Sequence, residues 1–189
     1  MYQISPKIAA QIKSADQANK QRQKVEPCTL FESYVPRRGG QEKLWETIPF
    51  HSIDDCPYRV VWLRGGIGSG KSHVGSAFVC TRAFLDPKSR GLITANSYSQ
   101  LETATLPALI EFCNQFNIPI SPRRATVEET AKAIAARRLV KIFDASILVL
   151  SAEAFMGQTV NSKEVGRGLQ IRYFFADEYS YSQKSVFDT

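Results

Sequence analysis

Residues 65 to 72 have the types and spacing needed to bind phosphate groups. They match the pattern G-x-x-x-x-G-K-[ST], the P-loop, with an apolar stretch before the glycines and helical spacing after them. Glycines let backbone N–H groups reach phosphate oxygens, because no Cβ intervenes and φ is free to be positive. The positive end of the following helix faces the same oxygens. The predicted nucleotide-binding residues are Gly65, Gly66, Ile67, Gly68, Ser69, Gly70, Lys71 and Ser72.

Two of these residues carry side-chain chemistry. We expect Lys71 to reach the β- and γ-phosphates, as a catalytic residue, and Ser72 to supply a hydroxyl ligand to Mg²⁺. A flexible glycine-rich turn is the alternative interpretation, but a turn has no need of Lys-Ser at a helix start. The pattern therefore predicts ATP and Mg²⁺ as cofactors.

A pair of acids follows the apolar run YFFA near the C-terminal end of the sequence. Asp177 and Glu178 have the pattern called Walker B, in which the Asp holds Mg²⁺ and the Glu polarises the attacking water. Taken alone, the pair is better explained as two solvated acids at a strand end. The P-loop in the same chain favours the catalytic interpretation, and a water-activating Glu favours hydrolysis over a kinase reaction.

Three further polar residues are candidates for the nucleotide site. Gln41 lies about 24 residues before the P-loop, and its amide can donate to and accept from an adenine edge. A surface glutamine at a helix start explains it equally well. Arg167, between two glycines, can act as an arginine finger on a neighbouring subunit's γ-phosphate, although an ordinary loop arginine is the alternative. Arg64, just before the P-loop, competes for that role.

The elements that position these residues alternate between strands and helices. Apolar runs predict strands over 58–63, 91–97, 138–152 (two short strands joined at Asp144-Ala145) and 170–178. Apolar spacing predicts helices over 41–50, 71–85, 98–117 with a break at Pro107, and 127–139. This alternation predicts an α/β fold with a mainly parallel central sheet flanked by helices. Residues 1–35 are predicted to form a basic N-terminal arm, with a frayed surface helix as the alternative, and residues 36–189 one domain.

Composition and charge limit the class of protein. With 43% hydrophobic and 22% charged residues, the chain has the composition of a globular protein. A net charge of +6 indicates an anionic partner, although a solvated basic surface gives the same count. The four cysteines form no C-x-x-C pair, which favours reduced thiols in a cytoplasm over a metal site. No apolar stretch approaches 18 residues, so we expect no membrane association.

Three segments together resemble the ATPase domain of phage terminase large subunits, the motors that package DNA into procapsids. They are LRGGIGSGKS, GLITANSYSQLETATLPALIEF and GRGLQIRYFFADE, and the resemblance spans about residues 36 to 182. Many ATPases share the P-loop, so ITANSYSQL and GRG are the more telling parts. The resemblance implies an additional-strand (ASCE) P-loop NTPase fold and ATP hydrolysis coupled to translocation of double-stranded DNA.

The resemblance also implies roles for single residues. Gln41 falls where that family often carries an adenine-reading glutamine. Lys71 and Ser72 match its Walker A pair, and Asp177 and Glu178 match its Walker B pair.

The arginines and the length of the chain differ from the family pattern. Arg167 matches a loop position from which some members present a trans-acting arginine finger, and members commonly have an Arg where this chain has Ile67. The family continues past Walker B with a coupling motif, a lid and an RNase H-like nuclease, whereas Thr189 lies about eleven residues after Glu178. We therefore expect a fragment or a split or degenerate gene product, truncated after Walker B, with an incomplete sheet and no nuclease domain.

The resemblance implies partners as well. These are double-stranded DNA, a portal protein, a small terminase subunit and further copies of the chain in a ring, in the host cytoplasm and not in a membrane. Segment 122–141, with six basic and two acidic residues, is a candidate DNA-binding surface. Two other functions remain open: a small P-loop nucleotide or metabolite kinase, and a non-catalytic nucleotide-binding assembly module.

Overall fold

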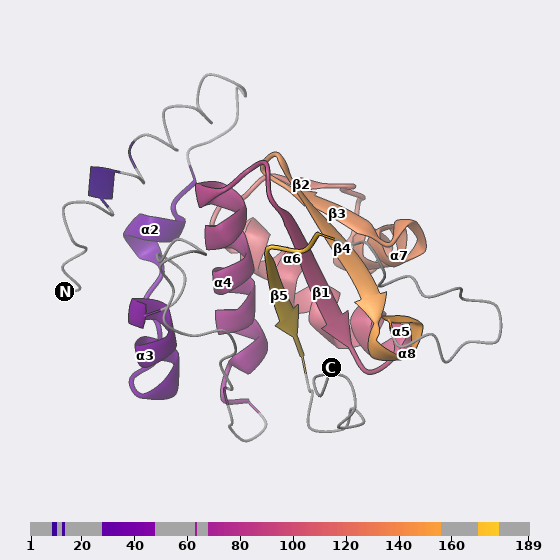
Figure 1. Cartoon of the computed structure of the whole chain (residues 1–189), viewed down its shortest axis with the longest axis horizontal. Helices are drawn as coiled ribbons and strands as arrows, with labels where there is room; N and C mark the ends of the chain where they lie inside the picture. Colours follow the sequence, from indigo (N-terminus) through magenta and orange to yellow (C-terminus); the bar gives the residue numbers. More distant parts are fainter. Residues whose placement is uncertain are drawn as a thin grey trace.

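Helices and strands alternate around one sheet in this protein (Figure 1). The computed structural model describes residues 9, 10, 13, 28–47, 63, 68–155 and 170–177. The helices are α2 (Leu30–Ser33), α3 (Gly40–Thr47), α4 (Lys71–Leu85), α5 (Tyr98–Gln100), the π-helical turn η1 (Leu101–Thr105), α6 (Leu106–Gln115), α7 (Val127–Arg137) and α8 (Ala152–Phe155). The strands are β1 (Arg90–Ala95), β2 (Ile120–Ser121), β3 (Leu139–Ile142), β4 (Ala145–Ser151) and β5 (Tyr173–Ala176). The α/β class is confirmed.

The sheet is mixed, so the prediction of a mainly parallel sheet is wrong. Its strand order is β2-β3-β4-β1-β5, in which β1 runs parallel to β4 and β5, while the pairs β2–β3 and β3–β4 are antiparallel. Only Phe143 and Asp144 connect β3 to β4, and a two-residue connection can join only antiparallel strands. Phe143 makes this turn with a φ of +51°, which few sequence rules anticipate for a bulky residue. The predicted P-loop strand, 58–63, lies outside the described residues except for Leu63.

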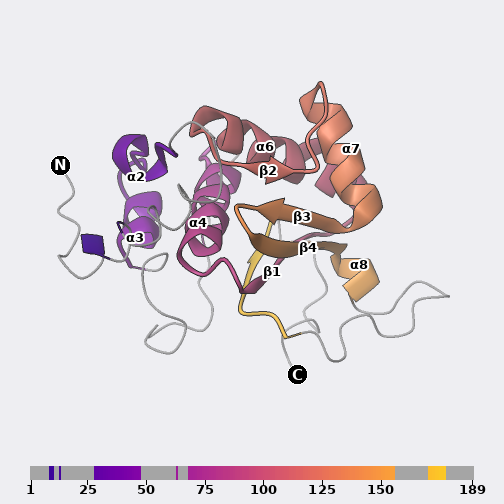
Figure 2. The same ribbon diagram turned by 90° about the horizontal axis from the view of Figure 1, so that it is seen from above.

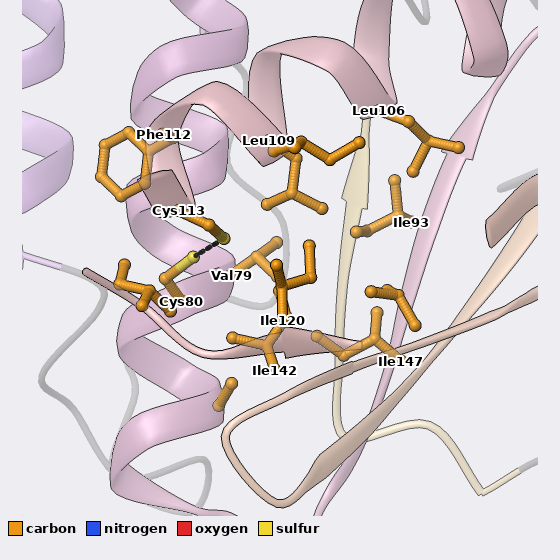
Figure 3. Close-up of a cluster of buried hydrophobic side chains, with 14 of the residues drawn as sticks. Val79, Cys80, Ile93, Leu106, Leu109, Phe112, Cys113, Ile120, Ile142 and Ile147 are labelled. Carbon is orange, nitrogen blue, oxygen red and sulfur yellow. Dashed lines mark hydrogen bonds between the residues drawn. The ribbon is translucent and has the colours of Figure 1, made fainter. Parts of the chain in front are cut away.

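The main helices lie on one face of this sheet. Figure 2 shows α4, α6 and α7 together on that side. Between them and the strands lies the hydrophobic core shown in Figure 3. Its members there include Val79, Cys80, Leu106, Leu109, Phe112 and Cys113 from the helices and Ile93, Ile120, Ile142 and Ile147 from the strands. Leu30 and Tyr34 also belong to this core, which therefore extends to residue 30 of the chain.

Helix α4 has the bounds predicted from the sequence. It begins after Gly70, whose φ of +76° is left-handed, and it ends at Leu85, two residues before Pro87. Ten of its fifteen residues are buried, all of them between Val74 and Phe84, whereas the first three residues are half-buried. Of the helices in the described ranges, none combines the length and apolar character needed to cross a membrane.

The helix predicted over 98–117 changes type instead of breaking at Pro107. α5, η1 and α6 follow one another directly, and Thr105 and Leu106 keep right-handed helical backbone angles. Proline has no N–H and cannot donate to the preceding turn. The N–H of Leu106 makes a π-type bond to the Leu101 carbonyl oxygen, so the missing N–H of Pro107 falls where the bonding changes from the π to the α pattern.

Candidate functional site

Ser72 from the predicted phosphate-binding loop and Asp177 from the predicted acidic pair meet at one edge of the sheet. β1, β4 and β5 are parallel, so their carboxyl ends share an edge, and helix α4 starts beside the tip of β5 (Figure 1). Asp177 directly follows β5, and its backbone N–H donates to the Thr94 carbonyl oxygen at 2.9 Å. Open α/β sheets characteristically bind ligands at this edge.

Ser72 and Asp177 form the centre of the candidate site. The Ser72 Oγ atom lies 3.2 Å from Oδ1 and 3.0 Å from Oδ2 of Asp177, although 105 positions separate the two residues in sequence. Ser72 is half-buried in the first turn of α4, and Asp177 is only 5% exposed. The structure thus brings together the two residues that the sequence predicts as magnesium ligands.

A regular packing of α4 against β5 sets this distance. Every third residue of α4 contacts every second residue of the chain from Tyr173 to Asp177. Ser72 bonds Asp177, and Gly75 packs against Phe175. Phe78 packs against Tyr173, with 6.1 Å between the ring centroids. Residues two apart on a strand point to the same face, so all three strand partners face the helix. The helix therefore runs antiparallel to β5, and its first turn is brought to the strand's carboxyl end.

Gly75 is the point of closest approach in this packing. A Cβ atom at Gly75 would lie 2.8 Å from Phe175 Cδ2 and nearer still to Cε2 and Cζ, so the helix backbone rests directly on the ring. Any larger residue would force either the Phe175 ring or α4 itself to move at the turn next to Ser72. The glycine requirement here comes from close approach and not from an unusual φ.

Thr105 is a third member of the site, and the sequence reasoning missed it. Its Oγ1 donates to Asp177 Oδ2 at 3.1 Å, and the side chain is 2% exposed. It is the last residue of the π-helical turn η1, and π turns occur frequently at functional sites. The sequence signal that could have pointed to Thr105 is Pro107, because a proline within a helical pattern marks where the backbone hydrogen bonding must change.

The glycine loop leads into α4 with two left-handed residues. Gly68 has φ +74° and Gly70 has φ +76°, a backbone region in which residues with a Cβ are strained. Lys71 begins the helix, with its Nζ atom 3.5 Å from Ser69 Oγ. Gly65, Gly66 and Ile67, together with Arg64, lie outside the described residues, so the first half of the loop stays a prediction.

Gln41 lies against the glycine loop and is buried. Its Nε2 donates to the Ser69 carbonyl oxygen, and its Oε1 accepts from the Arg37 backbone N–H at 3.1 Å. Nearby, Arg37 Nη1 donates to the Gly68 carbonyl oxygen at 3.0 Å. The alternative interpretation was a surface glutamine at a helix start. Gln41 does lie at the start of α3, but it is only 7% exposed and is therefore not a surface residue. Both ends of its amide bond the protein backbone, which ties α3 to the loop.

The remaining predicted site residues cannot be placed. Glu178 and Arg167 lie outside the described residues, and their catalytic roles stay predictions. Across the ranges that the structure covers, no group of three or more His, Cys, Asp or Glu side chains is arranged to hold a metal ion.

The Cys80 and Cys113 sulfurs lie 3.8 Å apart in the hydrophobic core (Figure 3). Burial is the main cause that raises the pKa of the Cys80 thiol.

Comparisons of the chain with protein-family models, with curated proteins and with solved structures each found no match. Function is therefore inferred from the residues and from the geometry described above.

Proposed function

We propose that this chain is the ATP-hydrolysing motor domain of a viral DNA-packaging terminase large subunit, coupling ATP hydrolysis to translocation of double-stranded DNA into a procapsid. The observation that carries the nucleotide-binding part is the contact of Ser72 Oγ with both carboxylate oxygens of Asp177. The motor part rests on the resemblance of the sequence to the terminase family. Each part needs its own test.

The donor set fits Mg²⁺. A serine hydroxyl and a carboxylate are hard oxygen ligands, and Mg²⁺ is usually held by one or two carboxylates, with waters and substrate phosphates completing its octahedron. Ser72 and Asp177 would hold the ion, with the serine proton directed to the carboxylate and a lone pair left for the metal. When bound, Mg²⁺ would neutralise charge that develops on the phosphates.

The chain's own residues support phosphate binding beside this pair. The first turn of α4 contains no acidic residue, and Gly70 before it has no side chain to cap the free N–H groups. These N–H groups and the helix dipole favour an anion at this position. Lys71, at the first position of the helix, adds a positive charge.

Hydrolysis and assembly are further parts of the proposal. Glu178 would accept a proton from the attacking water, and Arg167 would approach the γ-phosphate of a neighbouring subunit. A portal protein, a small terminase subunit and a ring of copies of this chain are the proposed partners, in the host cytoplasm.

An exposed basic surface supports the proposed DNA contact. All six basic residues of segment 122–141 are exposed: Arg123, Arg124, Lys132, Arg137, Arg138 and Lys141. Two of them have ordered neighbours: Arg123 Nη2 donates to Asn114 Oδ1 at 3.0 Å, and the Arg138 guanidinium lies 5.3 Å from the Tyr98 ring centroid. Affinity for duplex DNA through phosphates should fall steeply with salt, and a salt-independent affinity would contradict this surface.

The nucleotide site is tested by thermal melting with ATP and Mg²⁺. Ligand at about 100 times its Kd stabilises a protein by about 2.7 kcal/mol, which is easily measured. We expect Lys71→Ala to abolish this stabilisation, and Lys88→Ala, an exposed lysine beyond the other end of α4, to preserve it. An equal effect of nucleotide on the Lys71→Ala and wild-type proteins would refute the P-loop role.

Phosphate release separates the motor proposal from its alternatives. Release of phosphate from ATP without any acceptor would favour a hydrolase over a small-molecule kinase. Nucleotide binding without turnover, even at high protein concentration with DNA, would favour a non-catalytic assembly module.

A further inference from the structure

We propose that Thr105 is a positioning residue for the magnesium-binding carboxylate, acting through Asp177, and that the π-helical turn η1 is the device that directs it there. This inference rests on the proposed function, because it assumes that Asp177 and Ser72 hold Mg²⁺ with a nucleotide. It adds a residue from a helix that contributes nothing to the P-loop or to the Walker B strand.

The first observation is the burial of an oriented polar pair. Thr105 is 2% exposed and Asp177 is 5% exposed, and their side chains meet at 3.1 Å. A carboxylate removed from water must have its lone pairs satisfied by hydrogen bonds. Oδ2 accepts hydrogen bonds from both Ser72 Oγ and Thr105 Oγ1. Of these two hydroxyls, only Ser72 Oγ also donates to Oδ1. Thr105 therefore fixes the rotation of the carboxylate and leaves Oδ1 as the less occupied oxygen.

The second observation is the contrast between two threonines of the same turn. A threonine inside a helix ordinarily donates to the carbonyl four residues earlier. Thr103 does so, with its Oγ1 2.8 Å from the Ser99 carbonyl oxygen, and it is exposed. Thr105 donates across the fold to Asp177 instead.

The π turn explains why Thr105 can make this contact. The N–H of Leu106 donates to the Leu101 carbonyl oxygen, five residues earlier, which is the bond that defines a π turn. One additional residue in a turn rotates the following side chains by about 100° relative to the preceding ones. The turn thus sets the direction in which Thr105 points without breaking the helix that carries it.

A side chain that acts through a metal ligand affects metal affinity more than folding. Loss of such a supporting hydrogen bond typically costs 10–100-fold in metal affinity or activity. Thr105→Val keeps the shape and removes the donor. Thr105→Ser keeps the donor and removes only a methyl group.

The experiment titrates Mg²⁺ at a fixed concentration of ADP and follows the melting temperature. We expect the Mg²⁺ concentration for half-maximal stabilisation to rise about tenfold in Thr105→Val and to return to the wild-type value in Thr105→Ser. Stabilisation by ADP in EDTA should be the same in all three proteins. Two controls remove a threonine hydroxyl without touching Asp177: Thr103→Val at the surface, and Thr81→Val, whose buried Oγ1 has no hydrogen-bond partner among the described residues. Both should keep the wild-type Mg²⁺ requirement.

Each outcome decides a different point. A cooperatively melting Thr105→Val protein with an unchanged Mg²⁺ requirement would overturn the role of Thr105 and leave the proposed function standing. If wild-type protein shows no Mg²⁺-dependent effect of ADP, the proposed nucleotide site itself fails, and this inference fails with it. Should Thr105→Val not fold, Thr105→Ala removes the same donor without a branched side chain and is judged by the same criterion.

Discussion

Gly75→Ala tests whether the close packing of α4 on β5 sets the geometry of the site. The new Cβ would lie 2.8 Å from Phe175 Cδ2, at least about 0.6 Å inside the 3.4 Å at which ordinary contact begins. Two other ring atoms are nearer still, so the ring or the helix must move. Overpacking of this kind costs about 1–3 kcal/mol, whereas the better helix propensity of alanine returns about 1 kcal/mol. We expect a net loss of unfolding free energy of about 0–2 kcal/mol.

The larger effect should appear in nucleotide binding. If α4 moves outward at Gly75, Ser72 moves with it, because the two residues are about one turn apart. Stabilisation by Mg²⁺ and ADP in a thermal melt should therefore fall by more than the loss of folding stability measured in urea. Phe175→Leu, which shortens the opposing side chain, should partly restore both quantities in the double variant.

A matched control separates helix propensity from packing. Gly40→Ala, at the start of α3, meets only the flexible end of Leu63 at 3.0 Å, and it should leave the Mg²⁺ effect unchanged. The contrary result is that Gly75→Ala gains the stability expected from helix propensity alone and keeps the full Mg²⁺-dependent stabilisation. That result would mean that the Gly75–Phe175 contact does not hold Ser72 against Asp177.

Four other substitutions test separate parts of the molecule. Burial raises the pKa of Tyr34 from 10.0 to about 12, so the folded state favours the neutral phenol. The stability that the buried neutral phenol contributes is fully present below pH 10 and is lost as the pH rises towards 12. Tyr34→Phe should reduce the alkaline loss of stability in melts between pH 9 and 12; an unchanged pH dependence would exclude Tyr34 as its source. Gln41→Ala should weaken binding of ATP and GTP alike, since its amide holds the Ser69 carbonyl oxygen; a loss confined to ATP would instead support adenine reading. Glu178→Gln should keep nucleotide binding and abolish phosphate release, and retained turnover would assign the base elsewhere. Arg167→Ala should spare binding and block hydrolysis only in an assembled ring; equal ATPase rates with and without Arg167 in the ring would refute the arginine finger.

Local patterns predicted the elements whose signals lie within a short stretch of chain. The bounds of α4 follow from the glycine loop before it and from Asp86-Pro87 after it. The hairpin of β3 and β4 was also expected, with its turn one residue later than observed. Local patterns could not supply the strand order, because pairing depends on contacts between residues far apart in sequence. For this reason the sheet was predicted to be mainly parallel, whereas the structure shows a mixed sheet.

The candidate site divides in the same way. The sequence by itself determined which groups are present: a glycine loop that permits left-handed backbone, a lysine and serine at a helix start, and an aspartate after an apolar strand. Only the tertiary structure decided that Ser72 lies against Asp177, that Thr105 joins them, and that Gln41 is buried against the loop. The physical reason is that side-chain chemistry is a property of each residue, whereas hydrogen-bond partners are set by the packing of α4 on β5 and by one extra residue in a helical turn.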